Sequence, residues 1–172
     1  MTTHEFASVD DAIHFLMENL HLDGVPLQFP DVAQYLGKSG DVRALQPLLR
    51  ALKEGGSYIR ASAALGLGYL GKPEAATDLA EAFTHDRALY VRCDAALALG
   101  RLNTQDYLPL LIGRFTSENF EVRKRIAMAV ARMTGGKALE AQSTLQEMLS
   151  TVEMDDLERT FLQSLLEAKG KV

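Results

Sequence analysis

The sequence predicts an all-α fold: a short right-handed α-α superhelix of about four helical hairpins, with a capping helix at each end. Three observations predict it. An arginine-containing segment recurs along the chain, each copy carries small or apolar residues at helical spacing, and a second apolar helix pattern follows each copy. One such repeat cannot bury its apolar face alone, so neighbouring copies are expected to stack as a solenoid.

The first helix of each repeat is defined by its arginine, which stands at Arg60, Arg92 and Arg123 and recurs after 32 and then 31 residues. The positions three, four, six and seven residues after each arginine hold small or apolar side chains, a helical rather than an alternating spacing. Gly71 and Asn103 follow the first two copies, which is typical of a helix C-terminus.

The second helix of each repeat is predicted by apolar residues at i, i+3, i+4 and i+7, as in the run from Leu45 to Leu52. The last copy keeps Leu145 and Leu149 in two of these positions but places Gln142 and Gln146 in the others. Polar substitutions of this kind are expected in a terminal repeat that faces water.

We expect a single domain over residues 1–172. Its predicted parts are an N-terminal capping helix in 1–26, repeats at 27–56, 57–88, 89–119 and 120–152, and a C-terminal capping helix in 153–172. In the last segment Leu157, Phe161, Leu165 and Ala168 share one predicted apolar stripe.

The repeat pattern, Val or Ile, then Arg-x-x-Ala-Ala-x-Ala-Leu-Gly, a Gly-x-Pro-Glu-Ala break and an apolar helix, resembles the HEAT-like repeats named after phycobilisome lyases. The resemblance implies an armadillo-type solenoid. It also implies that an acidic residue six positions before the arginine links neighbouring repeats, and this position holds Glu54, Asp86 and Ser117. The link is therefore expected to be missing at Ser117, and the repeated arginines are interpreted as structural.

Composition disfavours several classes of function. The net charge of -5 has the wrong sign for a protein that neutralises phosphates. No segment approaches 18 uninterrupted apolar residues, and the start has no secretory signal pattern, so a cytoplasmic protein without membrane binding is expected. We find no catalytic, metal or cofactor motif: His14 and His21 are interpreted as solvated, and the lone Cys93 as a small, half-buried apolar residue.

A partner-binding surface is predicted on the second helices, which are expected to line the concave side of the superhelix. Its candidate residues are Arg43, Gln46, Arg50, Glu74, Thr77, Glu81, Asp106, Pro109 and Glu140, with Tyr107 and Arg114 at its flanks as the residue types typical of binding hot spots. The charge changes from basic through acidic to mixed along the array, which suits a protein or peptide ligand.

Three functions remain open at this point. The leading hypothesis is a non-catalytic protein-interaction module, such as an adaptor, scaffold, regulator or inhibitor. The alternative, which the resemblance implies, is a phycobilin lyase or another chromophore-handling protein. A third is nucleic-acid binding through the basic residues near 123–137. A monomer is favoured, although Phe6, Phe120 and Phe161 are apolar side chains without an assigned position in the predicted core.

Overall fold

The fold was examined in a computed structural model, which describes residues 6–21 and 29–167, without the side chains of 29–31. Every regular element in these residues is helical. The α-helices are α1 Val9–Glu18, α2 Phe29–Ser39, α3 Leu45–Glu54, α4 Ser57–Leu70, α5 Ala76–His85, α6 Leu89–Leu102, α7 Leu108–Phe115, α8 Phe120–Arg132, α9 Gly136–Thr151 and α10 Asp156–Glu167. Single 3-10 turns, Val42–Ala44, Pro73–Ala75 and Gln105–Tyr107, precede α3, α5 and α7.

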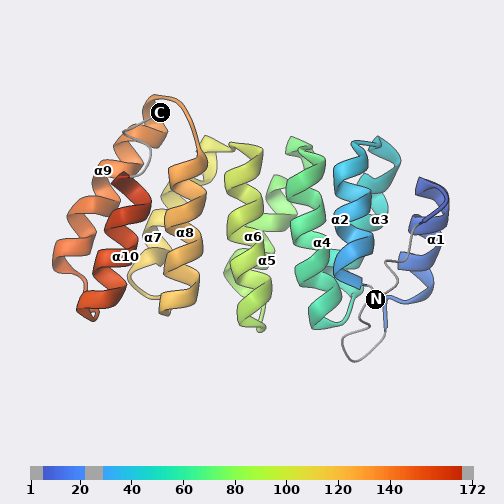
Figure 1. The fold of residues 1–172 in the computed structure, drawn as a ribbon, viewed down its shortest axis with the longest axis horizontal. Helices are drawn as coiled ribbons and strands as arrows, with labels where there is room; N and C mark the ends of the chain where they lie inside the picture. The colour runs from blue at the N-terminus through green and yellow to red at the C-terminus, as the bar shows by residue number, and fades with distance from the viewer. Residues whose placement is uncertain (1–5, 22–28, 168–172) are drawn as a thin grey trace.

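The helices form two layers along one axis (Figure 1). The first helices of the repeats, α2, α4, α6 and α8, pack side by side in chain order, and α10 packs against α8. The second helices, α3, α5, α7 and α9, form the other layer, and α1 packs against α2 and α3 at the N-terminal end. The predicted all-α solenoid of stacked hairpins is confirmed.

Small residues let the first helices approach each other closely. A Cβ added at Gly68 would lie 2.8 Å from the Cα of Ala98, and one added at Gly100 would lie 2.5 Å from the Cα of Ala129. Both glycines stand eight residues after their repeat arginine, so the same contact recurs at two successive junctions. A side chain at either position would therefore push neighbouring first helices apart.

The repeat arginines bind the loop that leads into the next first helix. Arg60 donates from Nε and Nη2 to the Asp86 carboxylate at 2.6 and 2.8 Å, and from Nη1 to the Gly55 carbonyl. Arg92 donates to Glu118 at 3.2 Å and to the Asp86 carbonyl. Each guanidinium thus joins the loop before its own helix to a carboxylate in the loop before the next first helix, which supports the structural interpretation of these residues.

The expected missing link at Ser117 is wrong. Glu118, the next residue, takes the carboxylate position and is only 8% exposed, while the Ser117 hydroxyl donates to the Arg114 carbonyl. Both links join residues 26 positions apart. The third repeat is one residue shorter between the acid and its arginine, so counting back from Arg123 finds the wrong position.

The predicted stripe on the C-terminal helix is wrong at Leu157 and Phe161, whereas Leu165 is half-buried and packs against the core. Ala168, the fourth predicted residue, lies outside the described residues. In α10 the buried residues are Leu162 and Leu166, whereas Leu157 is 83% and Phe161 39% exposed. The reason is the register of the first helices: Arg159 begins a further copy, donating to the Val152 carbonyl at 3.4 Å. Eight residues after Arg159 stands Glu167, in the position that Gly68 and Gly100 occupy in the earlier copies. Glu167 is exposed, which suits a helix that ends the array.

Several smaller expectations are settled by the packing. In α9 the buried residues include Ala138 and Ala141, whereas Gln146 is exposed, as expected of a terminal repeat. Cys93 is buried rather than half-buried, and burial raises the pKa of its thiol.

The three unassigned phenylalanines have aromatic neighbours: Phe6 contacts Phe15 and Tyr35, and Phe120 contacts Phe161 edge to face at 6.1 Å.

Candidate functional site

The second-helix face consists of the outward residues of α3, α5, α7 and α9 and of the 3-10 turns before α3, α5 and α7. The exposed candidates on it are Arg43, Gln46, Arg50, Glu74, Thr77, Glu81, Asp106, Pro109 and Glu140. Tyr107 and Arg114 are half-buried. The helical spacing read from the sequence therefore puts these side chains on one accessible surface, which two openings between helices divide into regions.

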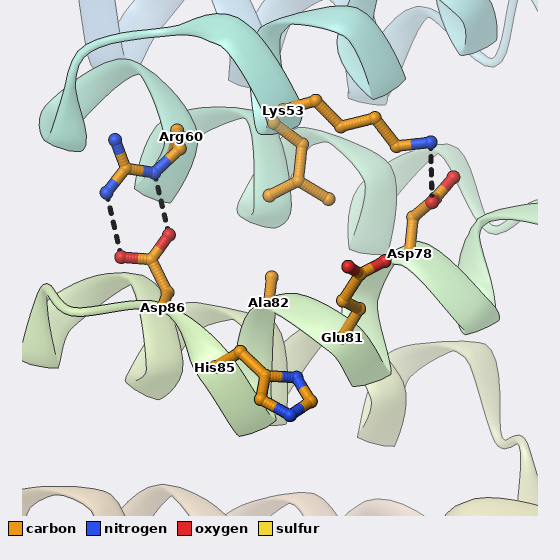
Figure 2. Close-up of a pocket in the computed structure, with 8 residues that line it drawn as sticks. Lys53, Arg60, Asp78, Glu81, Ala82, His85 and Asp86 are labelled. Carbon is orange, nitrogen blue, oxygen red and sulfur yellow. Dashed lines mark hydrogen bonds and ion pairs between the residues drawn. The ribbon is translucent and has the colours of Figure 1, made fainter.

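The α3–α5 crevice is the larger opening, with a volume of about 530 Å³. It is lined by Leu52, Lys53, Arg60, Asp78, Glu81, Ala82, His85 and Asp86. Figure 2 shows the Arg60–Asp86 and Lys53–Asp78 ion pairs on opposite sides of Ala82. Lys53 Nζ lies 2.7 Å from Asp78 Oδ1, so both cations in the crevice are already neutralised by the protein.

Electrostatics hold these crevice pairs in their charged forms. Burial raises the pKa of Asp86, but hydrogen bonds from Arg60 and from the Ala88 amide outweigh it, and the resulting pKa is lowered. The hydrogen bond with Asp78 is the main cause that raises the pKa of Lys53. Glu81 makes no ion pair with a described residue, so the crevice carries one surplus carboxylate.

The α7–α9 groove is smaller, about 350 Å³, and more apolar. Its lining consists of Gln105, Asp106, Leu108, Pro109, Ile112, Lys137, Glu140, Ala141 and Thr144. Three predicted residues, Asp106, Pro109 and Glu140, meet here. Lys137 Nζ lies 3.3 Å from Asp106 Oδ1 at the exposed edge, whereas Glu140 has no ion-pair partner among the described residues. The groove can hold an apolar side chain beside a free carboxylate.

The α5–α7 junction is closed by two of the predicted hot-spot residues. Tyr107 Oη and Thr77 Oγ1 lie 3.1 Å apart, and Arg114 donates from Nη2 to the Thr84 carbonyl. These side chains join neighbouring repeats, so their half-burial has a structural cause. On the second-helix face this bridged junction therefore separates the α3–α5 crevice from the α7–α9 groove.

The basic end of the face is neutralised, contrary to the charge sequence read from the candidates. Arg43 pairs with Asp10 at 2.8 Å and with Asp41 at 2.7 Å, and Arg50 pairs with Glu54 at 2.8 Å. The carboxylates that remain without an ion pair on the face are Glu74, Glu81, Glu140 and Glu147. The charges of the candidate residues alone do not reveal these ion pairs, although the i,i+4 spacing of Arg50 and Glu54 indicates one of them.

The basic patch of residues 123–137 is divided among several acids. Arg123 pairs with Glu158 at 3.0 Å, Lys124 with Glu121 at 2.7 Å, and Lys137 with Asp106. A continuous cationic track along a nucleic-acid backbone needs neighbouring unpaired cations. Because Arg123, Lys124 and Lys137 are paired, this patch offers fewer unpaired cations than the sequence implied.

Metal and membrane chemistry find no support in the part of the chain that the structure describes. No group of three or more His, Cys, Asp or Glu side chains there is placed to hold a metal ion. His14 contacts Glu18 at 3.0 Å on an exposed helix flank. None of the described helices is long and apolar enough to cross a bilayer.

The stacked helical hairpins, their linking arginines and the paired surface define an α-solenoid protein. The sequence matches the family described as HEAT repeats over residues 31–99 and 88–165, and the chain belongs to this family. The resemblance inferred from the repeat motif is thereby confirmed.

A solved structure of other proteins has a similar fold, whereas the curated proteins offer no match. Among solved structures, the chain is similar to the complex of CpcE and CpcF of phycocyanin lyase from Nostoc sp. PCC7120. The TM-score is 0.53 and the identity 20%, covering 98% of this chain and 79% of the other. At this identity the likeness shows a shared fold.

Proposed function

We propose that the chain is a non-catalytic protein-interaction module whose second-helix face binds a basic segment of a partner protein. One observation carries the proposal. Every Lys and Arg on α3, α5, α7 and α9 has a carboxylate partner in the chain, whereas Glu81, Glu140 and Glu147 on the same helices have none. A surface whose cations are all used and whose acids are free attracts a cationic ligand.

The α7–α9 groove is the anchor that we assign to this surface. Pro109 and Ile112 offer apolar contact in an opening of about 350 Å³, and Glu140 lies at its edge. A partner residue that enters the groove would bury apolar area, while a neighbouring Lys or Arg pairs with Glu140. Membership of the HEAT-repeat family and the likeness to a two-protein complex support a protein as the ligand.

Charge reversal on the second-helix face tests the proposal. Partners are captured from host lysate with the wild-type chain and with the Glu81→Lys, Glu140→Lys, Glu147→Lys variant. The control variant, Asp11→Lys, Glu153→Lys, Glu167→Lys, changes the net charge equally at exposed acids outside this face. All six acids lack ion-pair partners among the described residues, so both variants are expected to fold.

We expect one partner protein to be captured by wild type and control alike. The second-helix variant should bind it about tenfold more weakly or worse, because three attractive contacts become repulsive. Equal capture by all three proteins would contradict the proposal and move the site to another face.

The likeness to a phycocyanin lyase complex supports a second candidate, the handling of a linear tetrapyrrole. Such a ligand needs a sizeable apolar pocket with a few convergent polar groups. The α3–α5 crevice has the larger volume but is lined mainly by charged side chains in pairs. Mixing the protein with a linear tetrapyrrole and recording the visible spectrum tests this candidate; an unchanged spectrum removes it, and a shifted one favours it over the peptide ligand.

A further inference from the structure

The opposite surface of the array, the first-helix face, carries its own pattern. It consists of stripes at i, i+4, i+7 and i+11: Tyr58, Ser62, Leu65 and Tyr69 on α4; Tyr90, Asp94, Leu97 and Arg101 on α6; Glu121, Arg125, Met128 and Arg132 on α8. All of them are exposed or half-buried except Ser62, which is buried. Lys38 on α2, and Leu157 and Phe161 on α10, extend it at the two ends.

Exposed apolar side chains concentrate on this face. The large exposed ones among the described residues are Tyr58, Tyr90, Met128, Leu157 and Phe161 on the first-helix face, and Tyr35, Val42 and Leu139 elsewhere. Leu65 and Leu97 are half-buried and continue the apolar row between Tyr58 and Met128. A clustered apolar surface of this kind marks an interaction site, whereas scattered single residues do not.

Unpaired cations gather on the same face. Lys38, Arg101, Arg125 and Arg132 make no ion pair with a described carboxylate. Arg101 stacks over the Tyr69 ring at 4.1 Å, and Lys38 lies 5.1 Å from the centre of the same ring. In a chain of net charge -5, a row of free cations beside apolar residues is complementary to an acidic ligand.

Between these cations the face leaves hydrogen-bonding capacity unused. The Nε atom of Arg125 is buried and has no hydrogen-bond partner in the structure. Asp94 occupies the same position on the neighbouring helix α6 and makes no hydrogen bond with a described residue. A buried donor without a partner is costly, so a ligand carboxylate that accepts a hydrogen bond from Arg125 Nε gains affinity.

We propose that the first-helix face docks an acidic amphipathic helix of a partner protein. The apolar stripe of that helix lies on Leu65, Leu97 and Met128, and its carboxylates reach Arg101 and Arg132. This surface is separate from the second-helix face and has the opposite free charge, so the two faces select different ligands. A nucleic acid fits less well, because the Tyr58 and Tyr90 rings stack on each other at 4.9 Å and are not free to stack on bases.

Peptide binding tests the docking surface with the full chain. The probe is a fluorescent synthetic peptide in which Glu-Glu pairs alternate with Leu-Phe pairs, and its counterpart has Lys in place of every Glu. The tested variant is Arg101→Gln with Arg132→Gln, and the matched control is Lys72→Gln with Arg87→Gln, two cations that also lack ion pairs but lie in loops. Because Arg101 supports Tyr69, the exposed Arg132→Gln alone is measured as well.

We expect saturable binding of the acidic peptide, weakened about fivefold or more in the double variant and unchanged in the control. The second-helix variant described above should bind this peptide as wild type does, so the two proposals can fail separately. The docking proposal is overturned by a basic peptide that binds as well as the acidic one, by equal binding to all variants, or by no saturable binding up to the solubility limit. A single-stranded oligonucleotide that binds more tightly than the acidic peptide would also overturn it.

Discussion

Arg92 on α6 reaches the carboxylate of Glu118, which lies just before α8, across 26 residues of sequence. Arg60 reaches Asp86 across the same number of residues, although the two acids differ in their distance from the next arginine. The separation that is kept is therefore the forward one, from an arginine to the acid just before the next first helix. These links couple neighbouring repeats, as the nearest-neighbour energetics of a solenoid require.

Neutralising Glu118 should destabilise the chain more than changing its neighbour. Glu118→Gln removes the charge that faces the half-buried Arg92, and we expect a loss of about 2 kcal/mol in the free energy of unfolding. Ser117→Ala changes an exposed residue and should cost less than about 0.5 kcal/mol. Urea denaturation of both variants gives the comparison. A larger effect at Ser117 would mean that the repeat register drawn from Arg92 is wrong.

Two glycine-to-alanine substitutions should have opposite signs. At Gly100 the new methyl group would meet Ala129, so we expect destabilisation by about 1 to 3 kcal/mol. At Gly113, inside α7, no neighbouring atom lies within 4 Å, and the higher helix propensity of alanine should stabilise the protein by up to about 1 kcal/mol. Thermal unfolding monitored by circular dichroism measures both. Stabilisation by both substitutions would contradict the close packing of α6 on α8.

Asp94 should make stability depend on pH in the direction opposite to that of a salt-bridged acid. Burial raises its pKa from 3.8 to about 6, partly offset by Arg125. Between these values the folded state binds more protons than the unfolded state, so the contribution of Asp94 to stability falls as pH rises from about 4 to 6. Above the folded pKa the full penalty, at most about 3 kcal/mol, is present.

The Asp94→Asn variant isolates this effect from the other carboxylates. It should match wild type near pH 4, where Asp94 is protonated, and exceed it in unfolding free energy at pH 7. Urea denaturation of the two proteins at several pH values in this range provides the difference curve. A difference that does not change with pH would show that Asp94 titrates normally in the folded chain.

The sequence predicted the fold well because its strongest signals are local. The arginine spacing, the apolar positions after it and the breaks at Gly71 and Asn103 recur within short segments, and the helices follow them. Where the repeat length changes, counting from a single residue failed. The acid before Arg123 was placed one position early, and the stripe of α10 was assigned without recognising Arg159 as a repeat arginine.

The candidate surface was harder to predict because pairing is a property of the folded chain. Helical spacing identified Glu81 and Glu140 as exposed residues of one face. It could not show that Arg43 is bound by Asp10 from the N-terminal helix, or that Tyr107 bridges to Thr77. Long-range contacts of this kind decide which charges remain free, and they also separate the free acids of one face from the free cations of the other.

The most direct test of the interaction module is a charge exchange between Glu140 and the partner captured by the wild-type chain. Glu140→Lys should weaken the measured affinity about tenfold, and replacing the contacting Lys or Arg of the partner by Glu should restore it in that variant. An affinity that Glu140→Lys leaves unchanged would contradict binding at the α7–α9 groove of the second-helix face.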